Sequence, residues 1–564
     1  MVHRALKRLR GDNRGFIMFL ALTFATLLSL GSLVAIGPTV GEVQSAGNQL
    51  RDKRAFFQAD GGATLCRAEL KNRLQTALAA QLASLTSLTP VASYVTNNDP
   101  AGFLVQYAYQ SGTSYGGAFI RDGTTQARLP LTYTPSGAPG SYNCTLTVIS
   151  RTAPFNQGSG LAPQYLFRYR YTSSGNASEG GLSHTVNLQG IFSVMVQQDN
   201  FARYALFTNQ QTDASGTLVW FTNRTNFTGP VHTNGRFNFA LNPGASFTGL
   251  VDSVSTTANF YNNGSNISLD ANTNGSLDVP TFGAGFNRGS ANIPMPVTTT
   301  ADNQRDAALG LPMGTSVPGY SNGVYLGTSG GAMTGGIYVN GNAAISLSVA
   351  SPGVAGYTIV QGGTTSRVTV NYASNQTTFQ IGSNPSTNYT GVPNGMLFVD
   401  GTVNSLAGTV QRDTQLTVAA TNDVLITNNI TYENYTAGST PSAEGTNNVL
   451  GVLSWNGNVR ITSAAPNDIT ITGTVMTPNG QFTVDNYSSG SPRETATLLG
   501  GVIENTYGPF GTFSQNQQST GYGRNFVYDT RMGRGMAPPF FPTIGNVISS
   551  VAGLNDRPNW QQAN

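Results

Sequence analysis

Three stretches of this 564-residue sequence carry side chains whose types and spacing could support chemistry. The most specific is DANTNGSLD (270–278), where oxygen-bearing side chains occupy the first positions of a calcium-binding loop around Gly275. The candidate ligands are Asp270, Asn272, Asn274 and Asp278. The bidentate acid expected at the twelfth position is replaced by Thr281, so the sequence predicts weak calcium binding. The alternative is an Asx turn that holds no ion.

The other motifs give no support for an enzyme. GTSGG (327–331) fits the G-x-S-x-G pattern of a nucleophile elbow, but its flanks are typical of a loop rather than of a strand followed by a helix. His3, His184 and His232 are far apart in sequence, and no C-x-x-C, H-E-x-x-H or P-loop pattern occurs. We therefore expect no catalytic activity and no cofactor other than the candidate calcium ion.

Arginines interleaved with aromatic residues form the third candidate site. Their guanidinium groups could contact phosphates while the rings stack on bases, although strand residues that merely face solvent would look the same. The candidates are Arg168, Arg170, Arg524, Arg531 and Arg534. The net charge of +3 includes +4 from residues 1–15, which leaves −1 for the rest of the chain. Any DNA binding would therefore depend on such local groups rather than on a general positive field.

The N-terminal stretch KRLRGDNRGFIMFLALTFATLLSLGSLVAIGP predicts a membrane helix. Residues 16–36 carry no charge, and a run of this length spans a bilayer, whereas the apolar region of a secretory signal is shorter. The basic tip should stay in the cytoplasm, so that the rest of the chain is exported. We expect a retained anchor rather than a discarded signal.

Composition indicates an exported protein rich in β-structure. Only 10% of residues are charged, and Gly, Asn, Thr and Ser fill long stretches between apolar segments. In an exported chain the two cysteines, Cys66 and Cys144, most simply form one disulfide, with two buried free thiols as the alternative.

The pattern after the apolar run predicts an α+β unit. Leu70, Leu74, Leu78 and Leu82 follow at i+4 spacing, which extends the helix to residue 88, before Pro90. Four alternating segments then predict an antiparallel sheet packed on this helix, with Cys144 on one of its strands. They are GFLVQYAYQ (102–110), YNCTLTVISR (142–151), QYLFRYRYTS (164–173) and HTVNLQGIFSVMVQQ (184–198).

Residues 201–515 have a different texture, with short apolar triplets separated by polar turns. Apolar residues recur every 4–8 positions, as in Val403, Val410, Val418, Ile426 and Ile430. Such a pattern favours a β-solenoid in which each coil buries its face on the next, and a β-sandwich or a propeller is the alternative.

By these residues the chain resembles the type IV minor pilins. RGFIMFLALTFATLLSLGSLVAIGP looks like a class III prepilin signal, which implies cleavage after Gly15 by a prepilin peptidase and N-methylation of Phe16. RAFFQADGGATLCRAEL is similar to the PilX-type N-terminus, although Ala59–Gly62 matches its Ala-Glu-x-Gly stretch imperfectly. GPVHTNGRFNF (229–239) and GYGRNFVYDTRMGRGMAPPFFP (521–542) resemble the large ComZ-type competence pilins, in which a β-solenoid is inserted into the pilin sheet.

The resemblance implies a division of the chain. The expected parts are a leader (1–15), a long helix (16–88, transmembrane over 16–36), a pilin-like sheet (89–200), a β-solenoid insertion (201–515) and a segment returning to the pilin domain (516–564). Most pilins carry a Glu at the fifth residue of the mature chain, where it pairs with a neighbour's N-terminal amine. That position is Leu20 here, and in this family its loss is associated with subunits at or near the tip.

These expectations combine into one functional hypothesis. The chain would be a minor pilin at or near the pilus tip, presenting its β-solenoid to DNA during natural transformation. Its N-terminal helix would contact other major and minor pilins. Its further partners would be the prepilin peptidase, the inner membrane before assembly, and DNA. The body of the protein would move from the periplasm to the cell surface. The alternatives are a tip adhesin or structural subunit that binds no DNA, and a membrane-anchored polysaccharide lyase or hydrolase.

Overall fold

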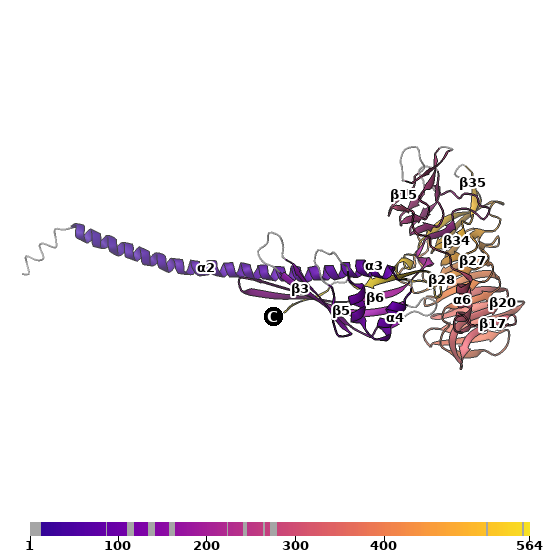
Figure 1. Ribbon diagram of the computed structural model, residues 1–564, viewed down its shortest axis with the longest axis horizontal. Coiled ribbons are helices and arrows are strands. Elements are labelled where there is room, and N and C mark those ends of the chain that lie inside the picture. The colour runs from indigo at the N-terminus through magenta and orange to yellow at the C-terminus, as the bar shows by residue number, and fades with distance from the viewer. Residues whose placement is uncertain are drawn as a thin grey trace, which may run out of the picture.

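The structure is a computed structural model of the full chain. It describes residues 13–85, 87–109, 118–133, 142–156, 164–222, 224–240, 245–262, 265–270, 279–317, 319–514, 517–554 and 558–563. One long helix leads into a mixed α+β unit, and a large, mostly β body lies across the far end of that unit (Figure 1). The coarse prediction of an α+β unit joined to a large β region is confirmed.

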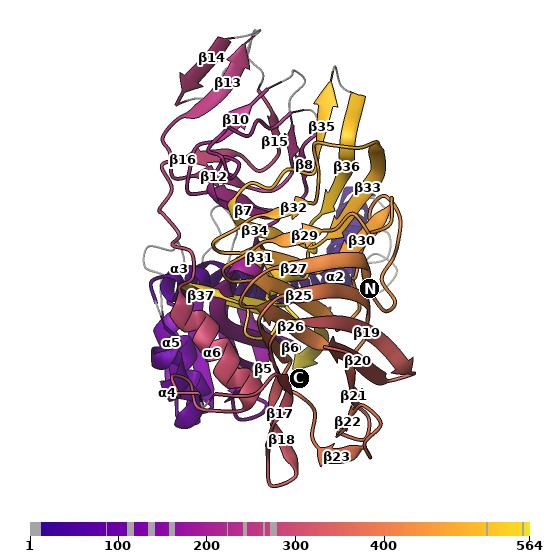
Figure 2. The same ribbon diagram turned by 90° about the vertical axis from the view of Figure 1, so that its right-hand side faces the viewer.

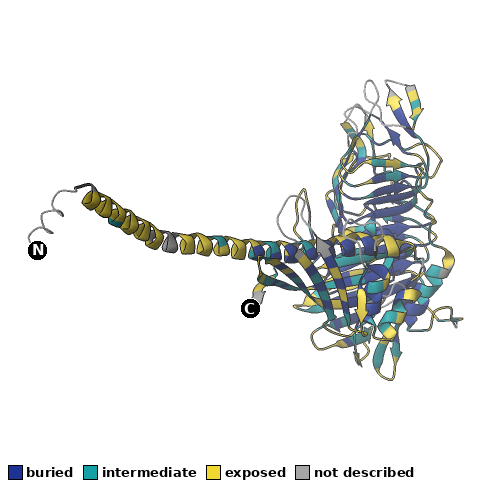
Figure 3. Cartoon of the chain, turned by 60° about the vertical axis from the view of Figure 1, so that its left-hand side comes forward, coloured by how far each residue is buried: buried dark blue, intermediate teal, exposed yellow. Residues whose placement is uncertain are grey.

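The long helix α2 (Asn13–Asn72) has two halves with opposite surroundings (Figure 3). Its first half carries a stretch, Gly15–Val34, that is long and apolar enough to cross a membrane and is not buried against any described part of the chain. Its second half, continued by a π-helical turn (Arg73–Ala77) and by α3 (Leu78–Ala83), packs on the sheet. The predicted leucine face is confirmed, since Leu70, Leu74, Leu78 and Leu82 are all fully buried.

The sheet behind this helix is antiparallel, in the order β1-β2-β3-β5-β6-β37, with β4 beside β5 and β38 beside β6. Its strands are β1 (Ile120–Asp122), β2 (Gln126–Tyr133), β3 (Tyr142–Ser150), β4 (Phe155–Asn156), β5 (Gln164–Glu179), β6 (Leu182–Asn200), β37 (Thr543–Ala552) and β38 (Asn559–Ala563). Along β5, Phe167, Tyr169 and Tyr171 face the helix, as the alternation of the sequence requires.

Helix and sheet are joined closely at two points. Cys66 on α2 and Cys144 on β3 form a disulfide with an S–S distance of 2.02 Å. At Gly175 on β5 a Cβ atom would lie 1.9 Å from the carbonyl oxygen of Ala59, so only glycine allows this approach of strand to helix. The disulfide and the glycine therefore fix the same helix face against the sheet.

Two local predictions in this unit are wrong. The segment 102–110 is not a strand: α5 (Pro100–Tyr107) covers most of it, because Asp99 caps the helix by accepting from the backbone N–H of Gly102 at 3.0 Å. Phe103 fits the alternation of apolar and polar residues expected of a strand. It also lies on the buried face of α5, where its ring stacks on that of Phe167 with 4.1 Å between the ring centres. The long helix ends at Ala83, and Pro90 instead lies in the first turn of α4 (Thr89–Thr96), where a proline is tolerated.

The body contains α6 (Thr298–Leu309) and strands β7 to β36. The strands are β7 (Leu206–Gln210), β8 (Asn226–Phe227), β9 (Val231–Thr233), β10 (Asn238–Phe239), β11 (Ser246–Phe247), β12 (Val251–Ser253), β13 (Ala258–Asn262), β14 (Ser265–Leu269), β15 (Thr281–Phe282), β16 (Phe286–Arg288), β17 (Gly323–Ser329), β18 (Ala332–Asn340), β19 (Ala343–Ser351), β20 (Val354–Gln361), β21 (Thr364–Asn371), β22 (Gln376–Ile381), β23 (Thr387–Thr390), β24 (Met396–Asp400), β25 (Val403–Val410), β26 (Gln415–Ala420), β27 (Val424–Tyr432), β28 (Val449–Ser454), β29 (Val459–Ile461), β30 (Ile469–Thr472), β31 (Thr474–Thr477), β32 (Phe482–Val484), β33 (Pro492–Leu499), β34 (Val502–Thr506), β35 (Gly511–Ser514) and β36 (Gln517–Val527).

Parallel ladders organise this body (Figure 2). One ladder runs β18-β24-β26-β28-β31-β34-β7-β9-β12-β16, and a second runs β19-β25-β27-β29-β32. In the second ladder, Val403, Val424, Val459 and Phe482 lie one above another, all buried. The recurring apolar residues noted in the sequence, from Val403 to Ile430, are likewise confirmed as core.

The chain enters the body in the middle of the first ladder. From β6 it passes to β7, builds β9, β12 and β16 toward one end, and crosses by α6 to β17 and β18 at the other end. It then stacks strand upon strand until β34 pairs with β7. The return to the antiparallel sheet begins only at β37, since β36 still pairs with β33 and β35; the predicted return from residue 516 starts too early.

Candidate functional site

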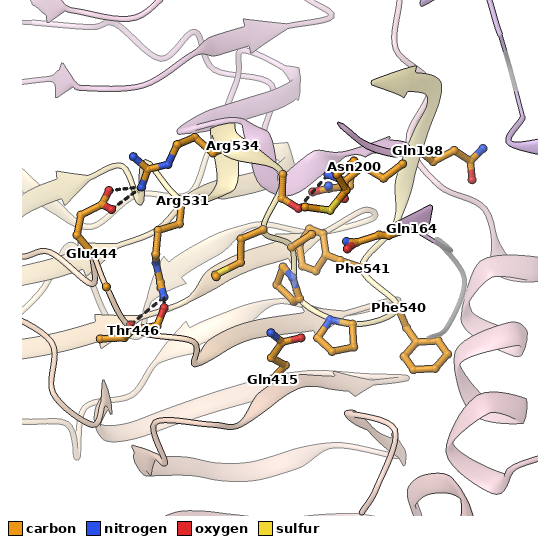
Figure 4. A pocket seen from close by; sticks show the side chains of 18 residues that line it. Gln164, Gln198, Asn200, Gln415, Glu444, Thr446, Arg531, Arg534, Phe540 and Phe541 are labelled. Atoms are coloured by element: carbon orange, nitrogen blue, oxygen red, sulfur yellow. Dashed lines mark hydrogen bonds and ion pairs between the residues drawn. The ribbon is translucent and has the colours of Figure 1, made fainter. Parts of the chain in front are cut away.

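The arginines singled out in the sequence lie in three separate places. Arg531 and Arg534 border a pocket of about 430 Å³ at the junction between sheet and body (Figure 4). Gln164 and Gln197 line it from the sheet, and Gln197 donates from Nε2 to the carbonyl of Gly535 at 2.9 Å. This pocket is therefore part of the connection that holds the body to the sheet.

Arg531 is not available to a nucleic acid, and its prediction as a DNA contact is wrong. The side chain is buried and paired with buried Asp529 at 2.6 Å. It also donates to the carbonyls of Thr446 at 3.1 Å and Asn448 at 2.9 Å, and its guanidinium lies 5.2 Å from the ring centre of Tyr432. Every part of the guanidinium thus has an internal role.

Arg534, three residues further, is exposed but paired with the carboxylate of Glu444, as the dashed lines in Figure 4 show. That pairing and a hydrogen bond from Thr530, which has the larger effect, lower the pKa of Glu444. An exposed pair of this kind can exchange partners with solvent or a ligand at little cost. Arg534 is thus accessible, although its charge is already balanced.

Arg168 and Arg170 lie on the outer face of β5, directed away from the helix. Both are exposed, and Arg168 lies over the ring of Phe155 at 5.1 Å. The backbone N–H of Arg151 donates to the carbonyl of Arg168 at 2.9 Å, and these two arginines line one shallow pocket. No carboxylate within ion-pair distance of any of the three is found in the described part of the chain.

Arg524 lies in an open cleft of about 720 Å³ between β36 and the segment 213–224. We call it the aromatic–arginine cleft. Its principal side chains are Trp220, Arg224, Tyr487, Tyr507, Phe513 and Arg524. Arg524 lies 5.3 Å from the ring centre of Tyr507 and donates to its hydroxyl, while Arg224 lies 4.9 Å from that of Phe513. Two guanidiniums thus lie within cation–π distance of two rings.

Burial and charge distinguish the members of the cleft. Burial raises the pKa of Tyr507, and the neighbouring Arg524 opposes this rise, so the phenol stays protonated and is fixed by the arginine. Arg224 and Phe513 are exposed at the rim. Asp213 also lines the cleft, but Ser215 and the backbone N–H of Thr217 donate to its carboxylate and lower its pKa. Planar groups that carry negative charge, such as nucleotides, fit such a surface.

Five of these residues were not identified from the sequence: Trp220, Arg224, Tyr487, Tyr507 and Phe513. They come from segments almost 300 residues apart, and they meet only because β7 pairs with β34 and closes the stack. The one local signal was WFTNR (220–224), an aromatic pair close to an arginine like those around Arg168 and Arg524. The described residues of the surrounding segment, GTLVWFTN, form only isolated bridges, at Leu218 and Phe221, and no strand.

The candidate calcium loop and the GTSGG motif lie elsewhere in the chain. Asp270 is exposed, and the other candidate calcium ligands, Asn272, Asn274 and Asp278, lie outside the described residues. Within the described residues no group of three or more His, Cys, Asp or Glu could hold a metal ion. GTSGG comprises the last three residues of β17 and the two-residue turn to β18, where Gly330 and Gly331 adopt positive φ.

The two histidines in the described part of the chain are both paired. His184 on β6 contacts Asp52 of α2 at 2.8 Å. His232 is buried in the body, between Asp252 and Asn234, and its ring stacks on Phe207. His184 therefore ties the sheet to the helix, and His232 ties successive strands together.

Comparison with known proteins gives one partial match. Residues 164–256 match the family model described as "Domain of unknown function (DUF4900)". Neither curated proteins nor solved structures give a significant match to the chain. The matched segment comprises β5, β6 and the first strands of the body through β12, so it covers the passage from the antiparallel sheet into the parallel ladders.

Proposed function

We propose that this chain is a type IV minor pilin at or near the tip of a pilus. The observation that carries the proposal is the contrast along α2. Its apolar half has no partner among the described residues, and its second half packs on an antiparallel sheet that β37 and β38 complete. The first half would lie in the inner membrane before assembly and among neighbouring pilins afterwards. Leu20, in place of the usual Glu, supports a position where no further subunit is added above.

The body would then be a β-solenoid inserted between β6 and β37. Supporting this are the parallel ladders, in which each strand pairs with one two or three strands further along the chain. The body lies at the end of the unit opposite the N-terminus (Figure 1). A bulky insertion in this position would project beyond the pilus shaft rather than into it.

Processing provides the first test of this assignment. We expect the mature protein, isolated from its own host, to begin at an N-methylated Phe16, because cleavage after Gly15 is what the leader implies. Intact-mass and N-terminal fragment spectra would measure this, with a strain lacking the prepilin peptidase as the control. A chain that still begins at Met1 in the presence of the peptidase would contradict the proposal.

We propose further that the aromatic–arginine cleft captures DNA during natural transformation. Exposed Arg224 and Phe513 at its rim, with Arg524 and Tyr507 behind them, combine cations with stacking surfaces. Stacking of a base on an aromatic side chain contributes about 1–3 kcal/mol, and each phosphate contact adds a salt-dependent term. The cleft therefore favours single-stranded or frayed DNA ends over an intact duplex.

The double variant Arg224→Ala/Arg524→Ala tests the cleft. We expect it to bind a single-stranded oligonucleotide at least about tenfold more weakly. The slope of log affinity against log salt concentration should become shallower by the equivalent of about one to two phosphate contacts. Fluorescence anisotropy of full-length protein in detergent, at several salt concentrations, would measure both. The matched control is Arg367→Ala, an exposed arginine on β21 at the other end of the body.

Two results would contradict this DNA site. Wild-type protein that retains no DNA even at low salt would rule out DNA capture altogether. The second result is that Arg224→Ala/Arg524→Ala keeps its affinity for DNA while Arg168→Ala/Arg170→Ala loses it. The DNA site would then lie on the outer face of the sheet.

A further inference from the structure

A second concave surface lies on the other side of the segment 211–222 from the aromatic–arginine cleft. It is an open groove of about 870 Å³ at the carboxyl ends of the neighbouring parallel strands β7, β9 and β12. Side-chain amides and hydroxyls predominate in its lining, and we call it the carboxamide groove. Its characteristic residues are Gln210, Gln211, Thr212, Asn234, Asn266 and Ser268.

The floor of the groove is rigid because its amides bond to one another. Asn234 donates to Oδ1 of Asn209 at 3.0 Å, and Asn209 donates to Oδ1 of Asn505 at 2.9 Å, so one amide ladder crosses three stacked strand ends. The carbonyl of Ile293 accepts a further bond from Asn234 at 2.7 Å. A ligand would thus meet a surface that needs no reorganisation.

Two buried polar groups on the same wall are unsatisfied. Gln211 is 2% exposed, and its Nε2 has no hydrogen-bond partner among the described residues, although its Oε1 accepts from Thr208 at 2.9 Å. The hydroxyl of Thr212, also in the lining, has no partner in the same described set. Leaving a buried donor unpaired costs about 1–3 kcal/mol, which a ligand acceptor would recover once a change of rotamer turns the Gln211 amide toward the groove.

The low charge of the groove argues against a polyanionic ligand. Arg236 is the one charged side chain among the described lining residues, and its Nε lies 3.4 Å from the hydroxyl of Ser255. A site for a phosphodiester backbone needs several cations to gain from counterion release. The groove therefore selects for a ligand with many hydroxyl or amide groups and no net charge.

We propose that the carboxamide groove binds a neutral oligosaccharide. Amides donate and accept at once, as pairs of sugar hydroxyls require, and Leu218, exposed at the rim, offers an apolar surface for a ring face. Parallel strands repeat every ~4.8 Å, close to the length of one pyranose unit, so polar groups on successive strand ends match successive residues of an unbranched glycan. This site shares no lining residue with the aromatic–arginine cleft.

Calorimetric titration of the full-length protein in detergent tests the proposal. The probes are the neutral hexasaccharides of cellulose, starch and chitin, with hexagalacturonate and a single-stranded oligonucleotide as charged comparisons. We expect saturable binding of at least one neutral probe, weakened at least tenfold by Gln211→Met, which removes the amide at nearly constant volume. Ser268→Trp, on the exposed face of β14, should abolish binding by filling the groove without touching its buried floor.

The controls separate this site from the DNA site. Gln376→Ala, an exposed glutamine on β22 far along the body, should leave glycan binding unchanged. Arg224→Ala/Arg524→Ala should also leave it unchanged, so the two proposals stand or fall separately. The proposal would be overturned by the absence of saturable binding to any neutral probe. It would equally be overturned by binding that Gln211→Met and Ser268→Trp do not alter, or by Ser268→Trp abolishing binding of the oligonucleotide instead.

Discussion

Replacing Arg531 by alanine is expected to destabilise the protein by about 3–5 kcal/mol. The substitution leaves the carboxylate of Asp529 buried without its cation, and it removes the donors that satisfy the carbonyls of Thr446 and Asn448. Since the residue lies where the body meets the sheet, the loss should appear as a lower melting temperature of the body. Circular dichroism of the β signal against temperature would measure it.

Arg534→Ala is the matched control, since it removes an exposed arginine from the same segment. Its pair with Glu444 is exposed on both sides, so we expect a change of about 1 kcal/mol or less. Arg531→Lys should be intermediate, because lysine keeps the charge of the guanidinium but not its planar array of donors. An unchanged melting temperature for Arg531→Ala, together with weaker DNA binding, would contradict the structural role and restore a ligand-binding one.

Glu504 should make the stability of the body depend strongly on pH. Its carboxyl on β34 is buried, and burial raises its pKa from 4.5 to about 8, against the opposing hydrogen bonds from the backbone of Phe482 and Gly508. The folded state therefore holds a proton that the unfolded state releases above pH 4.5. This contribution to the free energy of unfolding is fully present below pH 4.5. It falls by about 5 kcal/mol in total as the pH rises toward 8.

Glu504→Gln should remove this dependence. The amide stays neutral at every pH, and its oxygen can accept the same two backbone hydrogen bonds. We expect the variant to resemble the wild type near pH 5 and to be more stable near pH 9, in melting curves recorded at a fixed scan rate. Glu494→Gln, an exposed carboxylate on the adjoining β33, controls for the chemical change. Parallel wild-type and variant curves across this range would contradict the assignment.

Local patterns predicted the parts of the fold that depend on near neighbours in sequence. The i+4 leucines of α2 and α3 and the alternation along β5 both appear in the structure as buried faces, because helix and strand periods act over a few residues. The segment 102–110 was wrongly predicted because Phe103 and Tyr107 fit a strand period as well as a helix face. The cap at Asp99 and the packing of Phe103 on Phe167 decided in favour of the helix.

The candidate sites depended on contacts that no local pattern contains. Arg524 and Arg531 looked alike in sequence, seven residues apart among aromatic neighbours. One lies beside Tyr507 in an open cleft, and the other is buried against Asp529. Burial of an arginine depends on which segments close over it. Arg531 is covered by the segment 446–448 and Asp529, whereas Arg524 lies at a cleft that forms where β34 pairs with β7.

The sequence by itself thus determined the apolar N-terminal helix, the helix face that meets the sheet, and the β character of residues 201–515. These follow from periodicity and composition, which act over short distances along the chain. Only the tertiary structure decided that β34 pairs with β7, so that Trp220 and Arg224 line one cleft with Tyr507 and Arg524. The pairing of β7 with β9 likewise brings Gln211 and Asn234 to one groove. The physical reason is register: parallel strands distant in sequence are aligned by the packing of their apolar triplets, and that alignment brings their polar ends together.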